Sequence, residues 1–116
     1  MERIIKISDK EYKMKSSAFT QFAYKNETGR SFIGDIKNLA KLDVNKLEDL
    51  TADEIDGVIE LLLRISYILI KEADSTQVTD YESFLRSINS IYDDKEWMND
   101  VILLACSPIS GRLHQD

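Results

Sequence analysis

This 116-residue chain is poor in the residues that build crosslinks and catalytic sites, with one cysteine (Cys106), one proline (Pro108) and one histidine (His114). A lone cysteine cannot form an internal disulfide, so the fold does not depend on such crosslinks. The metal, nucleotide and phosphate motifs H-E-x-x-H, C-x-x-C, G-x-G-x-x-G and the P-loop are absent from the sequence. We therefore expect no enzymatic activity, no metal and no cofactor.

A long apolar run is also missing. The most apolar stretch, LLLRISYILI at 61–70, contains Arg64 and is bounded by Glu60 and Lys71, whereas a membrane span needs about 20 apolar residues. The first residues, MERIIKISDK, lack the apolar centre of a signal peptide. These features predict a protein of a reducing compartment with no membrane partner.

Positive charge is scarce overall, because 21 acidic residues outnumber 15 basic ones and leave a net charge of −6. Nucleic-acid binding depends on clustered Lys and Arg, so we expect no nucleic-acid partner. The charge is uneven: residues 1–50 carry +2 and residues 51–116 carry −8. This polarity would suit weak head-to-tail self-association between copies, although scattered solvating charge is the commoner explanation.

The chain has the length and the apolar content of one domain with its own core, since 43% of its residues are hydrophobic. The patterns predict a mainly α fold, a small helical domain of about five helices with an N-terminal β-hairpin. We expect this domain to cover residues 1–106, and residues 107–116 to form a flexible tail, because they show no periodic pattern.

The hairpin is predicted at residues 3–15, where apolar residues alternate with lysines around the turn residues Ser8 and Asp9. Two short helices should follow, one from Ser17 to a cap at Gly29 and one that carries Phe32. Phe19 and Phe22 recur at helical spacing, and their expected role, with Phe32, is to pack in the core.

The longest predicted helix covers residues 52–74 and begins with a capping box formed by Thr51 and Glu54. Two further helices should start after Thr79 or Asp80 and after Asp93 or Asp94; the last carries Trp97 as a core residue. The carboxylates 93, 94, 96 and 100 lack the ligand pattern of a calcium loop. Helix capping explains them better than a metal site.

The long helix has more apolar residues than one buried stripe requires. It is therefore either the centre of the fold or partly an interface. In the second case the surplus side chains would bind a protein partner, and we take as candidates Leu61, Tyr67, Ile68 and Ile70. A different hypothesis takes residues 17–41 as a helix-turn-helix of a small DNA-binding transcription regulator of phage or mobile-element origin. It would need Arg30, Lys37 and Lys41 on one face.

The order of these elements, the stretch KISDKEYKMKSSAFTQFAYKNETGRSFIGDI and the segment AD-x-x-x-x-x-DYESFL together carry a family resemblance. Over roughly residues 4–105 the chain resembles the tail assembly chaperones of long-tailed (siphovirus) bacteriophages, in particular those from phages of Gram-positive bacteria.

This resemblance implies a non-enzymatic protein that binds and solubilises the tape measure protein during tail morphogenesis. It implies a location in the host bacterial cytoplasm and absence from the mature virion. Family members are often made in a second, longer form by a programmed ribosomal frameshift, and that form recruits the tail tube protein. The present chain would correspond to the short form.

Overall fold

A computed structural model describes residues 1–42, 44–92 and 94–109. It confirms the predicted fold class, with five α-helices and an N-terminal antiparallel hairpin in the described part of the chain. The predicted tail lies largely outside the described residues; a short 3₁₀ turn, Ser107–Ile109, follows the last helix. Among the described helices, none combines the length and the apolar composition that crossing a bilayer requires.

The hairpin consists of β1 (Glu2–Ile7) and β2 (Lys10–Lys15), with Ile5 opposite Tyr12. Its inward face is buried as the alternation predicts, and the side chains on it are at most 1% exposed: Ile5, Ile7, Tyr12 and Met14. The charged residues on the other face remain in solvent. Since a two-stranded ribbon is marginal alone, the hairpin depends on the helices beneath its apolar face.

Two short helices follow: α1 (Thr20–Thr28) and α2 (Phe32–Ala40). Gly29 ends α1 with φ 73°, and its N–H donates to the Lys25 carbonyl at 2.8 Å. This left-handed conformation favours glycine because it has no Cβ. Ser31 caps α2 by accepting from the Gly34 N–H. A 3₁₀ segment (Val44–Asp49) then leads to the long helix.

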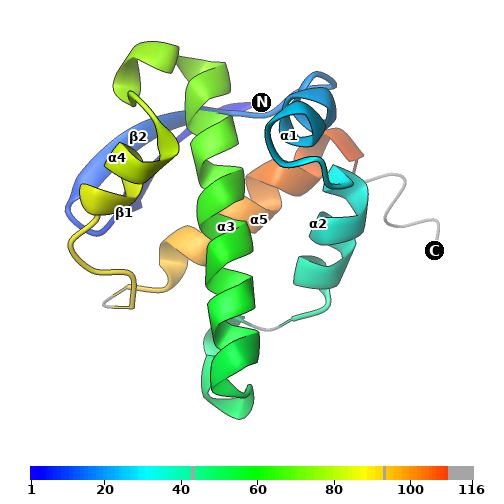
Figure 1. Ribbon diagram of the computed structural model, residues 1–116, viewed down its shortest axis with the longest axis vertical. Helices are drawn as coiled ribbons and strands as arrows, with labels where there is room; N and C mark the ends of the chain where they lie inside the picture. Colours follow the sequence, from blue (N-terminus) through cyan, green and yellow to red (C-terminus); the bar gives the residue numbers. More distant parts are fainter. Residues whose placement is uncertain (43, 93, 110–116) are drawn as a thin grey trace.

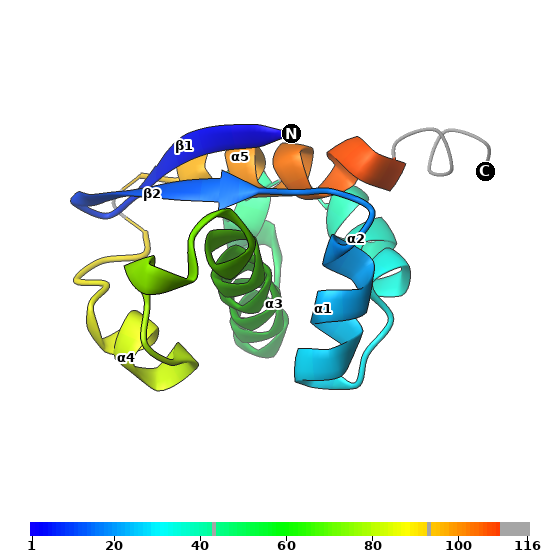
Figure 2. The ribbon, with the colours of Figure 1, turned by 90° about the horizontal axis from the view of Figure 1, so that it is seen from above.

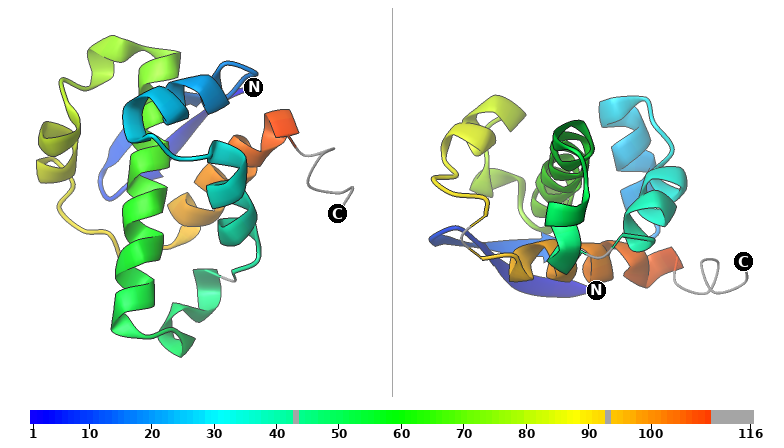
Figure 3. Two further views of the ribbon diagram at one scale, coloured as in Figure 1. Left: turned by 45° about the vertical axis from the view of Figure 1, so that its right-hand side comes forward. Right: turned by 90° about the horizontal axis from the view of Figure 1, so that it is seen from below.

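The long helix α3 (Ala52–Ala73) is the centre of the molecule. A 3₁₀ turn (Ser75–Gln77) and α4 (Tyr81–Arg86) follow, and α5 (Glu96–Cys106) completes the domain. In Figure 1, α3 runs vertically with α1 and α2 on one side and α4 on the other. In Figure 2, seen from above, the hairpin and α5 form a second layer, drawn above α3. The view from below in Figure 3 shows the same two layers.

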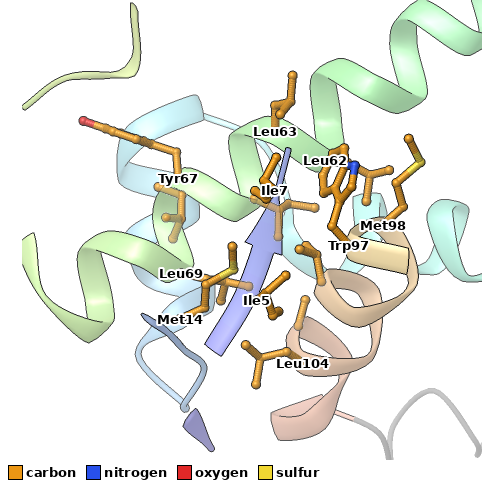
Figure 4. Close-up of a cluster of buried hydrophobic side chains, with 14 of the residues drawn as sticks. Ile5, Ile7, Met14, Leu62, Leu63, Tyr67, Leu69, Trp97, Met98 and Leu104 are labelled. Atoms are coloured by element: carbon orange, nitrogen blue, oxygen red, sulfur yellow. The ribbon is translucent and has the colours of Figure 1, made fainter. Parts of the chain in front are cut away.

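Because elements surround the second half of α3, its side chains are buried in nearly every direction. All residues from Leu62 to Ile70 are buried except Arg64. A helix that is apolar all round is a buried helix, and this accounts for the surplus apolar residues. Figure 4 shows the resulting core, in which Trp97 and Met98 of α5 lie near Leu62, Ile7 and Ile5. Trp97 is 2% exposed, as predicted.

Helix capping follows the prediction closely in two of three cases. The capping box of α3 is present, with Thr51 accepting from the Glu54 N–H and Glu54 accepting from the Thr51 N–H. Asp80 caps α4. At α5 the N-cap position is Lys95, and Asp94 accepts instead from the Glu96 N–H at 2.9 Å; Asp93 lies outside the described residues.

The capping box leads to a prediction about stability. Thr51→Ala should lower the free energy of unfolding by about 1 kcal/mol, because it leaves an N–H of the first turn of α3 without its acceptor. Thr51→Ser, which keeps the hydroxyl, should stay close to wild type. Urea unfolding followed by circular dichroism measures both. Equal stability of the alanine and serine variants would show that the cap contributes nothing here.

Candidate functional site

The four side chains expected to bind a partner do not form an exposed surface. Tyr67, Ile68 and Ile70 are 3%, 4% and 0% exposed, so the expectation that they are surplus to the core is wrong. Only Leu61 is half-buried rather than buried. Packing against the hairpin, α1 and α4 accounts for the other three. Replacing Ile68 by a polar residue would therefore unfold the domain rather than reveal an interface.

Tyr67 belongs to an aromatic cluster between α3 and α4. Its ring makes an edge contact with Tyr81, with the ring centres 5.4 Å apart, and a tilted contact with Phe84 at 5.9 Å. The Arg64 guanidinium lies 3.7 Å from the centre of the Tyr81 ring, a cation–π arrangement. These contacts attach α4 to α3, so Tyr67 has a structural role.

Two aromatic residues assigned to the core lie instead at the surface of α1. Phe19 and Phe22 are 61% and 60% exposed, whereas Phe32 is buried as predicted at 3%. On α1 the inward positions are held by Thr20 and Tyr24, both 0% exposed. Phe19 and Phe22 lie on the opposite side of the helix, since residues three apart share a face. We call these two residues the α1 aromatic pair.

Hydrogen bonds explain why α1 turns Thr20 and Tyr24 inward and its two phenylalanines outward. The Tyr24 hydroxyl donates to Asp35 at 2.6 Å, and the Thr20 hydroxyl donates to Glu72 of α3 at 2.7 Å. The Ser17 hydroxyl donates to the other oxygen of Glu72 at 2.6 Å. Both acceptors are carboxylates, and hydrogen bonds to charged groups are stronger than neutral ones. The polar face of α1 is thereby drawn inward and the phenylalanines face solvent.

The buried carboxylate of Asp35 is held by two partners. Arg30 makes a bidentate pair with it, with both nitrogen–oxygen distances at 2.8 Å, and Tyr24 donates to it from the core. Arg30, with help from Tyr24, lowers the pKa of Asp35 despite its burial, which acts in the opposite direction. Burial, and next the hydrogen bond to Asp35, raise the pKa of Tyr24. Asp35 is therefore ionised and Tyr24 neutral near pH 7, an arrangement that stabilises the α1–α2 junction.

Two hollows lie along α1, and Phe19 lines the smaller of them. Between α1 and the second half of α3 lies a hollow of about 280 Å³, lined by Phe19, Ala23, Ile68 and Lys71 among others. A groove of about 610 Å³ continues between α1, α2 and the first half of α3, and Glu27 lines both. We call the second hollow the α1–α3 groove. Its apolar lining residues are Leu39, Leu42, Leu50, Val58 and Leu61, and its charged ones are Glu27, Arg30, Glu54, Glu60 and Arg64.

The geometry defines a candidate surface for protein binding. It consists of the α1 aromatic pair and the α1–α3 groove, with an apolar lining and side chains of both charge signs among its walls. Of the residues expected to bind a partner, this surface includes only Leu61. Sequence reasoning missed Phe19 and Phe22 because their outward orientation depends on Glu72, which is 52 residues away from Thr20.

Other reactive groups do not assemble into a site in the described ranges. Among those residues there is no group of three or more His, Cys, Asp or Glu side chains that could hold a metal ion. Cys106 is half-buried at the end of α5, and burial raises the pKa of its thiol.

Comparisons with protein-family models, with curated proteins and with solved structures found no match to this chain.

Proposed function

We propose that the protein is a phage tail assembly chaperone that binds the tape measure protein and keeps it soluble while the tail is built. The observation that carries the proposal is the exposure of both rings of the α1 aromatic pair, of which Phe19 lines the small hollow that shares Glu27 with the α1–α3 groove. Exposed apolar side chains next to a hollow are typical of binding surfaces for other proteins. The resemblance in element order and sequence supplies the class of partner.

The lining of the α1–α3 groove suits a helical partner. An amphipathic helix lays its apolar face into a groove of this kind, and charged residues along the groove fix its register. Five apolar side chains line the α1–α3 groove, and carboxylates and guanidinium groups lie among them. The net charge of −6 keeps the chaperone itself soluble while it presents apolar surface. Binding of this kind involves no catalytic step.

Co-expression tests the proposed function. Expressed with the tape measure protein of the same genome, this chain should keep that protein soluble and co-purify with it in many copies per molecule. A tape measure protein that stays insoluble and unbound would contradict the proposal. Gel-shift assays would then test the transcription regulator, for which Arg30 is a poor candidate because its guanidinium is paired with Asp35.

The binding surface has a test of its own. Phe19→Ser with Phe22→Ser should reduce co-purification roughly tenfold or more. Burying one phenylalanine ring against the partner contributes about 1.5–3 kcal/mol to binding, and the double variant loses two such rings. Folding should be unaffected, since both rings face solvent. Tyr92→Ser is the matched control, because Tyr92 is an aromatic residue that is 52% exposed outside this surface. Equal loss in the control, or no loss in the double variant, would place the interface elsewhere.

A further inference from the structure

The two edges of the hairpin differ in how their backbone groups are satisfied. In an antiparallel pair, hydrogen-bonded residue pairs alternate with pairs whose N–H and C=O groups point outward. Met1 and Ser16 exchange both backbone bonds, at 2.7 and 2.8 Å. With the register Arg3↔Met14 and Ile4↔Lys13, the outward groups therefore belong to residues 2, 4 and 6 on β1 and to residues 11, 13 and 15 on β2.

The β2 edge is covered. The Gln77 side-chain amide accepts from the Lys13 N–H at 2.8 Å and donates to the Lys13 carbonyl at 2.9 Å. It therefore occupies the position that a third strand would take. Figure 2 shows β2 between β1 and α3, so this edge faces the body of the molecule.

The β1 edge is open. Within residues 1–42, 44–92 and 94–109, no hydrogen bond reaches the outward backbone groups of Glu2, Ile4 or Lys6 from another element. In Figure 2, β1 forms the upper border of the molecule, and in the right panel of Figure 3 it forms the lower border. Ile4 is 60% exposed on the outer face. An open edge with an exposed aliphatic side chain is a template for another strand.

The side chains on this edge are complementary to themselves. If two copies of β1 pair antiparallel about a two-fold axis at Ile4, the isoleucines lie opposite each other and Glu2 of each copy lies opposite Lys6 of the other. Apolar and opposite-charge pairs at such positions stabilise a sheet, and like charges destabilise it. Centring the pair on Glu2 or on Lys6 would instead place like charges opposite each other. The complementary side chains therefore favour a second copy of β1 as the partner and the register centred on Ile4.

We propose that β1 is a self-association edge, through which two copies of this chain join their hairpins into one four-stranded antiparallel sheet. The outward N–H and C=O groups of Glu2, Ile4 and Lys6 bond to those of the second copy, and the interface is symmetric, as in most homodimers. The contact is limited to one strand per copy, so the dimer is weak and reversible. The α1 aromatic pair lies on another element, so this proposal does not depend on the proposed binding of the tape measure protein.

Sedimentation analysis over a concentration series, up to about 1 mM, tests the proposal. Any tag belongs at the C-terminus, because the Met1 amine donates to the Ser16 carbonyl. Wild type should pass from monomer to dimer as concentration rises. Ile4→Pro should remain monomeric and folded, because the proline removes only an outward N–H and proline is tolerated on edge strands.

Charge exchange tests the register. Lys6→Glu should raise the dimer dissociation constant roughly tenfold, because it places two pairs of like charges across the interface. Glu2→Lys should do the same. An equal mixture of these two variants, and the double variant Glu2→Lys with Lys6→Glu, should recover wild-type association. Lys13→Glu on β2 is the control with the same change in net charge, and it should dimerise as wild type does.

Three results would overturn the proposal. The first is a wild-type chain that stays monomeric over the whole concentration range, which would leave the edge to a strand of a different protein. The second is a Lys13→Glu variant that loses association as strongly as Lys6→Glu. The third is a mixture of the two single variants that fails to associate. If Ile4→Pro does not fold, the charge series alone decides.

Discussion

Trp97→Ala should lower the free energy of unfolding by about 3–5 kcal/mol, a large share of the ~5–15 kcal/mol typical of a small domain. The ring is 2% exposed and lies between α5, α3 and the hairpin, so its removal leaves a cavity where three elements meet. Its indole N–H donates to the Ile91 carbonyl at 3.1 Å, and this bond attaches the loop before α5 to the core. Urea unfolding monitored by circular dichroism measures the loss.

Two variants separate the contributions of the ring. Trp97→Phe keeps most of the aromatic volume and loses the hydrogen bond, so it should cost less than the alanine variant. Tyr92→Ala removes an exposed ring from the neighbouring loop and should cost under about 1 kcal/mol. A Trp97→Ala variant as stable as Tyr92→Ala would mean that α5 is not packed as described.

Asp35→Asn should cost about 2–3 kcal/mol at pH 7, because charge-assisted hydrogen bonds from Arg30 and Tyr24 are weakened around a side chain that is 5% exposed. The cost should depend on pH in a defined direction. Arg30, ahead of the other contributions, lowers the pKa of Asp35 in the folded state below its ordinary value of 3.8. The stabilisation is therefore complete above about pH 4–5 and is lost as the pH falls through the lower, folded-state value.

Comparing the stability of wild type with that of Asp35→Asn separates the titration of Asp35 from that of the other carboxylates. Glu54, Asp74 and Asp80 also have lowered pKa values, each through hydrogen bonds in its cap or turn, and they titrate alike in wild type and variant. The stability difference between wild type and Asp35→Asn should be constant from pH 5 to 7 and should shrink below about pH 4. A difference that stays constant down to pH 2 would show that folding does not lower the pKa of Asp35.

Local patterns predicted the hairpin, the long helix and its caps because the sequence near each element determines them. Alternation of apolar residues and lysines places Ile5 and Tyr12 on one face of the hairpin, and Thr51 with Glu54 begins α3. Packing in these elements agrees with the local preferences, so no distant contact overrides them.

The candidate binding surface could not be predicted in the same way. An excess of apolar residues on α3 indicates burial on many sides or exposure at an interface, and only the positions of α1, α4 and the hairpin decide between them. The orientation of α1 depends on Asp35 and Glu72, whose carboxylates draw Tyr24 and Thr20 inward. Nothing near Phe19 in the sequence shows these partners.

The β1 edge is an intermediate case. The alternation of Glu2, Ile4 and Lys6 is visible in the sequence, but its significance depends on the register with β2 and on the Gln77 amide, which is 64 residues away from Lys13. Only the three-dimensional arrangement shows that one edge of the hairpin is covered and the other is open.

A titration of the purified chain into a purified helical segment of the tape measure protein tests the proposed function most directly. Isothermal calorimetry should show saturable binding of several copies per long segment, with a negative heat-capacity change, because apolar surface including the α1 aromatic pair is removed from water. The Phe19→Ser, Phe22→Ser double variant should bind more weakly and Tyr92→Ser as wild type. Absence of binding by the wild-type chain, with the segment folded and soluble, would contradict the chaperone function.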